Sequence, residues 1–113
     1  MAVTDVLRDQ VHKIEISNTF VLADDTLTIR AAVAGVTLRV TGGVLTTNSA
    51  TTIKFKRGST ATDFQPRIAG NGSLVLPPCE MGYMDTTVDT EDLIIASSSG
   101  ATTVSGVLWV REI

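Results

Sequence analysis

The two residue types that could do acid–base or nucleophilic chemistry near neutral pH each occur once, as His12 and Cys79. A metal-binding β-barrel enzyme needs two or three histidines and a carboxylate, because transition metals prefer imidazole ligands. Catalysis by Cys79 would require a base to form the thiolate, and His12 is the one neutral-pH candidate. Cys79 also precedes Glu80, whose charge disfavours a thiolate. We therefore expect a surface or packing role for His12, and neither an enzyme nor a cofactor.

Acidic residues cluster late in the chain and could bind a cation. They are Asp85, Asp89, Glu91 and Asp92. Carboxylates are suitable calcium ligands, but this spacing lacks the glycine-containing loop of an EF-hand. We expect a solvated acidic turn and no metal ion.

A basic group of opposite sign, Lys54, Lys56 and Arg57, follows an apolar alternation in the middle of the chain. If it and the acidic residues Asp89, Glu91 and Asp92 lie on opposite sides of a protomer, the two groups would meet head to tail around a ring. Complementary charge of this kind fixes register more than it supplies affinity. Both groups are candidate interface residues, and ordinary solvated charge is the alternative.

Two aromatic residues, Tyr83 and Trp109, could form a platform on which a sugar ring stacks. The chain has only five aromatic residues, so most of them are needed in the core. Packing is therefore the alternative role for both.

Length and charge limit the classes of protein that fit. With 113 residues the chain has room for one domain. A net charge of -3 argues against binding to a phosphate backbone, which needs a surplus of Lys and Arg. No stretch approaches the roughly 20 apolar residues of a membrane helix, and the first residues lack the basic and apolar pattern of a secretion signal. We expect a soluble, unsecreted chain with no nucleic-acid and no membrane partner.

The elements that would position these residues are strands. Apolar and polar residues alternate over residues 11–16, 26–30, 36–41, 52–56 and 103–111, the period of half-buried strands. Residues 73–76 and 84–87 are shorter candidates, and residues 93–96 are apolar on both faces, which predicts a central strand. The residues expected to point inward are Ile14, Ile16, Leu27, Ile29, Val36, Leu38, Val40, Ile53, Phe55, Leu74 and Leu76.

Turn residues separate these segments. We expect Ser17-Asn18 to end the first strand, Asp24-Asp25 to form a turn, and Asn71-Gly72 to form a primed turn. Gly42-Gly43 predicts a hairpin, because both positions tolerate positive φ. Pro66 restricts its segment to an edge strand or an ordered loop.

The resulting pattern of about eight strands, 8 to 12 residues apart, is typical of an antiparallel β-sandwich or barrel. We assign residues 11–113 to this all-β domain. Residues 1–10 place Val3, Val6 and Leu7 on one side of a helical turn and are assigned as an N-terminal arm that contacts a neighbouring protein. A frayed terminus is the alternative.

Three stretches resemble a known class of proteins. Residues 53–60 form a strand that ends in Gly-Ser, residues 69–77 contain Asn-Gly-Ser before a Leu-Val-Leu-Pro strand, and residues 104–110 contain a Val-Ser-Gly strand. This order is similar to that of small β-sandwich accessory proteins of tailed-phage virions, which include the capsid decoration, or cement, proteins. The resemblance covers residues 51–113.

The resemblance implies a jelly roll that is made in the host cytoplasm and added to the outer surface of a capsid. Such proteins commonly sit as dimers or trimers at symmetry axes and bridge neighbouring coat subunits. We therefore expect the major capsid protein as partner and a homo-oligomer as the active form. The alternative is a carbohydrate- or receptor-binding module of a head fibre or tail tip, with Tyr83 or Trp109 as its platform.

Overall fold

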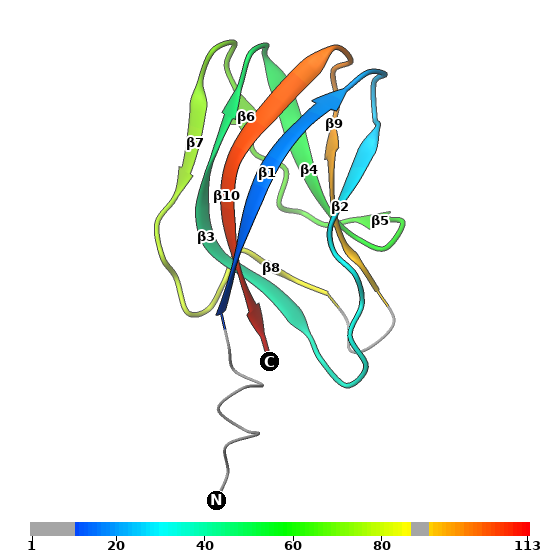
Figure 1. The fold of residues 1–113 in the computed structure, drawn as a ribbon, viewed down its shortest axis with the longest axis vertical. Helices are drawn as coiled ribbons and strands as arrows, with labels where there is room; N and C mark the ends of the chain where they lie inside the picture. Colours follow the sequence, from blue (N-terminus) through cyan, green and yellow to red (C-terminus); the bar gives the residue numbers. More distant parts are fainter. Residues whose placement is uncertain (1–10, 87–90) are drawn as a thin grey trace, which may run out of the picture.

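The computed structural model describes residues 11–86 and 91–113, and within them every regular element is a β-strand (Figure 1). No helix among these residues is long and apolar enough to cross a membrane. The strands are β1 (Val11–Phe20), β2 (Thr26–Arg30), β3 (Leu38–Thr47), β4 (Thr51–Arg57), β5 (Thr60–Ala61), β6 (Arg67–Ile68), β7 (Ser73–Leu76), β8 (Met84–Asp85), β9 (Leu93–Ser97) and β10 (Thr102–Glu112).

The strands form two antiparallel sheets that pack face to face. One sheet has the order β1-β10-β3-β7, with β8 also paired to β3, and the other has the order β2-β9-β4-β5, with β6 also paired to β4 (Figure 1). The pairing is nested: β1 pairs with β10, β2 with β9, β3 with β7, and β4 with β5 and β6. Nested antiparallel pairing of this kind is the double-sheet jelly roll. The predicted all-β sandwich is confirmed.

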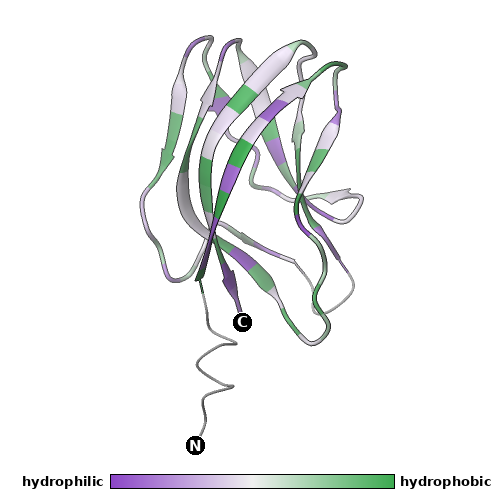
Figure 2. Ribbon diagram, viewed as in Figure 1, coloured by the Kyte–Doolittle hydropathy of each residue, from purple (hydrophilic) through white to green (hydrophobic). Residues whose placement is uncertain are grey.

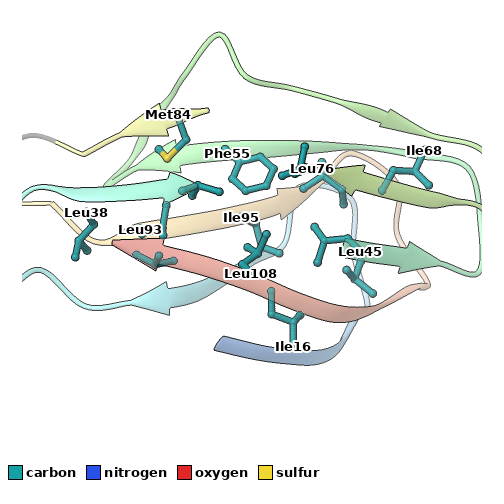
Figure 3. Packing of buried hydrophobic residues seen from close by; sticks show 14 of the residues in the cluster. Ile16, Leu38, Leu45, Phe55, Ile68, Leu76, Met84, Leu93, Ile95 and Leu108 are labelled. Carbon is teal, nitrogen blue, oxygen red and sulfur yellow. The ribbon is translucent and has the colours of Figure 1, made fainter. Parts of the chain in front are cut away.

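The core lies between the two sheets and is almost entirely aliphatic (Figure 3). Strand side chains alternate between faces, so each strand contributes every second residue to it; Figure 2 shows this alternation along β1. The predicted inward positions are confirmed. Ile16, Val36, Leu38, Val40, Ile53, Phe55 and Leu76 are buried, and Ile14, Leu27, Ile29 and Leu74 are partly buried against them.

Several of the turns and strand positions expected from the sequence are also present. Asp24 has a positive φ of 64° in the expected turn. Asn71 also has a positive φ, 54°, but its turn is closed by the Gly72 N–H and the Ala69 carbonyl at 2.9 Å, so Asn71 is the third residue of a type II pattern and the expected primed turn is wrong. A carboxylate oxygen of Asp25 accepts a hydrogen bond from the backbone N–H of Leu22 at 2.8 Å. The segment 93–96 is central, because β9 lies between β2 and β4. Pro66 accepts a hydrogen bond from the Ile53 N–H just before the short strand β6.

Two expected strand ends are wrong. The pair Ser17-Asn18 does not end the first strand, because β1 continues to Phe20 and pairs with β10 along its whole length. Gly42-Gly43 is not a hairpin but lies inside β3. At this point the register between β3 and β10 shifts, so that Thr41 is an extra residue between the Val40 and Gly42 pairings. This is a β-bulge, which bends a strand and increases its twist.

The glycines are needed because β3 and β10 approach each other closely. A Cβ at Gly43 would lie 2.3 Å from the Val107 carbonyl oxygen, and one at Gly106 would lie 2.0 Å from the Val44 carbonyl oxygen. Both glycines also have φ near +145°, a region that other residues rarely adopt. Positive-φ tolerance serves regular pairing of β3 with β10 here rather than a turn.

Candidate functional site

Two of the three basic residues predicted as contacts, Lys54 and Lys56, lie together on the outer face of the β2-β9-β4-β5 sheet. Ile53 and Phe55 of β4 are buried, so Lys54 and Lys56, which alternate with them, face outward. Lys54 lies beside Ala96 and Lys56 beside Ile94 in the adjoining strand β9. The Lys54 Nζ is 3.3 Å from an Asp24 carboxylate oxygen.

Arg57 ends β4 and is exposed. It occupies the same alternating phase as Ile53 and Phe55 and lines a hollow with Tyr83 and Asp85, so it does not share the outer face with the two lysines. We call Lys54 and Lys56 the basic strip.

The acidic residues lie beside the basic residues of β4 rather than opposite them. The Asp92 carbonyl accepts a hydrogen bond from the Gly58 N–H at 2.8 Å, next to Arg57. A Cβ at Gly58 would be 3.8 Å from the Glu91 side chain. The premise of a head-to-tail ring, that the two charge groups occupy opposite sides of a protomer, is therefore not met by Glu91 and Asp92. Asp89 lies outside the described residues, as do Val3, Val6 and Leu7 of the expected arm.

The carboxylates considered for calcium already have protein partners. An Asp92 carboxylate oxygen accepts a hydrogen bond from the Ala32 N–H at 2.7 Å. Asp85 holds Arg39 in a two-pronged contact, with distances of 2.7 and 3.0 Å, and this hydrogen bonding raises the pKa of Arg39. Among residues 11–86 and 91–113, no three metal-ligating side chains converge. Asp85 and Asp92 act as structural groups in this arrangement.

His12 and Cys79 are not brought together. The His12 Nε2 lies 3.1 Å from a carboxylate oxygen of Glu112, which also contacts the Arg30 guanidinium. Cys79 lies after β7, where its N–H donates to the Thr41 carbonyl at 2.8 Å. The arrangement gives Cys79 no histidine base.

The His12, Arg30 and Glu112 cluster was missed from the sequence. It joins β1, β2 and β10 and so connects the two sheets, and Glu112 is buried. One signal was available: Glu112 falls on the same alternating positions of the last strand as the buried Leu108 and Val110. A carboxylate in that phase must point inward, where it needs a cation.

The two candidate platform aromatics do not form a joint surface. The Tyr83 ring stacks on Phe64 with a centroid distance of 5.4 Å, and its hydroxyl donates to the Pro77 carbonyl. The Trp109 indole lies on the outer face of the other sheet and is 39% exposed. It packs beside Gly42, where a Cβ would be 3.5 Å from the ring.

Trp109 belongs to an exposed apolar surface that sequence reasoning also missed. In the β1-β10-β3-β7 sheet, Val107 pairs with Val44, and Val44 pairs with Val75, which makes one row across three strands. Val44 is 43% exposed and Val75 is 62% exposed. Together with Trp109 and Val11 these residues form what we call the apolar face. The signal was that β3, β7 and β10 carry apolar residues in both alternating phases.

Two hollows lie along this face. One, of about 300 Å³, is lined by Val11, Pro78, Cys79 and Trp109, with Glu80 and Arg111 among its polar residues. The other, of about 310 Å³, is polar, and its walls are Thr46, Thr47, Asn48, Asn71, Gly72, Ser73, Thr103 and Ser105.

The chain was also compared with known proteins. No known family model matches it, and no curated protein does so either.

The described residues therefore form one sandwich with two unlike outer faces. The β2-β9-β4-β5 sheet presents a basic strip, and the β1-β10-β3-β7 sheet presents an apolar face. Charged strips and exposed apolar rows are both features of surfaces that bind other macromolecules.

Proposed function

We propose that this chain is a non-enzymatic decoration protein of a tailed-phage virion. It binds the outer surface of the capsid shell and stabilises neighbouring subunits of the major capsid protein. The jelly-roll fold and the resemblance of residues 51–113 to phage accessory proteins support this role.

The observation that carries the proposal is the basic strip. Lys54 and Lys56 project outward from one strand of a chain whose net charge is -3, and Lys54 lies 3.3 Å from an Asp24 carboxylate oxygen, so this outer face carries a local, partly compensated positive charge. Such a strip fits an acidic surface of a coat subunit. Each exposed ion pair is weak, but a shell offers the same contact many times, so that an oligomer attaches by several weak contacts at once.

Co-sedimentation tests the proposal. Purified protein is mixed with undecorated capsids of the phage that encodes it, and the pellet is assayed over a range of salt concentrations. We expect binding at low salt that weakens as salt rises, because exposed charges are screened over about 8 Å at physiological ionic strength. Failure to pellet with the shell at any salt would remove the proposal.

A pair of variants shows which face is used. Lys56→Glu reverses a charge in the basic strip and should lower shell binding about tenfold or more. Arg67→Glu makes the same change at an exposed position outside both the basic strip and the apolar face, and serves as the matched control for loss of positive charge. If the two variants bind equally well, the basic strip is not the contact.

A carbohydrate- or receptor-binding module is the second candidate. The polar hollow and the exposed Trp109 favour it, because hydroxyl and amide groups hydrogen-bond sugars and indole rings stack on them. A glycan array read together with Trp109 fluorescence separates the two functions. A blank array and an unchanged emission spectrum would eliminate the sugar-binding function.

A further inference from the structure

We propose that the apolar face of the β1-β10-β3-β7 sheet binds a second copy of this chain about a two-fold axis. This inference is independent of shell binding, which uses the other sheet. It rests on the register of the strands, the exposure of the apolar row and the arrangement of charge around that row.

The residues of the apolar face lie next to one another on the sheet surface. Val107, Val44 and Val75 lie side by side across three neighbouring strands, with Trp109 in the adjacent row. Isolated exposed apolar residues are normal on a protein surface, but a contiguous patch marks a contact. Aromatic residues are also enriched at such contacts, and Trp is a frequent energetic anchor.

The charges around the patch identify a second copy as the occupant. Three cations and three carboxylates surround it: Lys13, Arg39, Arg111, Glu15, Glu80 and Asp85. This face is therefore neutral, although the chain carries a net charge of -3. Two identical copies with net negative charge repel each other electrostatically. Contact through this neutral face avoids that repulsion.

The register places opposite charges where a two-fold axis needs them. Lys13, Trp109 and Gly42 lie in one row, and Glu15, Val107 and Val44 lie in a second row two residues further along. The row between them, through Leu108, points into the core. A two-fold axis in the plane of the interface and along this middle row exchanges the two outer rows.

The exchange gives complementary contacts throughout. Lys13 of each copy faces Glu15 of the other, and Trp109 faces Val107. Val44 faces Gly42, which has no side chain and so leaves room for it. An interface with two-fold symmetry must be self-complementary in this way.

The size of the face suits a dimer of low affinity. Strands β1, β10 and β3 have ten or eleven residues, so three of them cover roughly 500 Å² in projection at about 3.4 Å per residue and 4.8 Å between strands. A standard interface buries about 800 Å² per partner. An interface below the standard size is typical of weak, transient association, so we expect a weak and reversible dimer.

Sedimentation velocity over a concentration series tests the dimer. The full chain should shift from monomer to dimer as its concentration rises through the micromolar range. Val75→Glu, at a position that is 62% exposed and outside the core, should weaken association about tenfold or more. Lys56→Glu, on the other sheet, should leave it unchanged.

A charge exchange between copies tests the axis itself. Lys13→Glu and Glu15→Lys should each weaken self-association, because every copy then faces its own charge. An equimolar mixture of the two variants should form dimers again, since the glutamate introduced into one chain would face the lysine introduced into the other. Thermal unfolding of each variant checks that the fold is intact.

The outcomes are decisive. A chain that stays monomeric up to millimolar concentration overturns the dimer, and a mixture that does not recover overturns the axis. Shell binding is scored separately by co-sedimentation, so either proposal can fail alone.

Discussion

At the scale of single residues, Glu112 makes the contact that links the two sheets through charged side chains. Its buried carboxylate contacts both His12 and Arg30, and so ties together strands from both sheets. The Arg30 Nε is buried and has no hydrogen-bond partner among the described residues, so this guanidinium depends on the carboxylate for compensation of its charge.

Replacement of Glu112 by Ala should therefore lower the free energy of unfolding by about 2–4 kcal/mol, because a partly buried cation loses its counter-charge. Urea denaturation followed by circular dichroism measures this loss. Glu15→Ala is the matched control: Glu15 is exposed and 3.9 Å from Lys13, and its removal should cost less than about 0.5 kcal/mol. Equal effects of the two substitutions would contradict the role assigned to Glu112.

At the scale of elements, the pairing of β3 with β10 controls the shape of the sheet. Both strands are long and central, and each contributes a glycine at which a Cβ would overlap a carbonyl oxygen of the other strand. The bulge at Thr41 lets Val40 and Leu45 both point into the core, although they are an odd number of positions, five, apart. It also aligns Trp109 over Gly42 on the outer face.

Gly43→Ala and Gly106→Ala should each cost more than about 3 kcal/mol, because the new Cβ would overlap a carbonyl oxygen and the φ is unfavourable for alanine. Gly35→Ala separates the cost of the steric overlap from the cost of the unfavourable φ. Gly35 also has a positive φ, +73°, but a Cβ there meets nothing within 4 Å, so the expected cost is about 1 kcal/mol. Urea denaturation compares the three variants, and near-equal costs would show that the close approach of the strands is unimportant.

At the scale of the whole molecule, the jelly roll brings strands β1 and β10 together (Figure 1). It leaves two outer faces of different chemical character. The sheet with the basic strip suits weak, repeated, salt-sensitive contacts, and the sheet with the apolar face suits contact with a second copy. A dimer of this kind would present two basic strips to a shell, which increases attachment through multivalency.

Removal of residues 1–10 tests the predicted division into an arm and a domain of residues 11–113. We expect the free energy of unfolding to change by less than about 1 kcal/mol, since the buried core of the described residues begins at Ile16. Co-sedimentation with capsids should weaken if Val3, Val6 and Leu7 contact the coat. A truncated chain that does not fold would show that the boundary is wrong.

The sequence by itself determined the strands and their inward residues. Alternation is a local property of the chain, so the phase of Ile53 and Phe55, or of Leu27 and Ile29, could be read without knowing which strand lies next to which. The basic strip was found for the same reason, because its lysines occupy the other phase of β4.

Only the tertiary structure decided which strands are neighbours, and the remaining features depend on that. Gly42-Gly43 has the local signature of a hairpin, and its true role follows from the approach of β10, a strand far away in the sequence. Glu112 meets Arg30 from 82 residues away. The apolar face exists because nested pairing sets Val107, Val44 and Val75 in one row. Contacts between distant strands are set by packing of the whole sandwich, which no local pattern encodes.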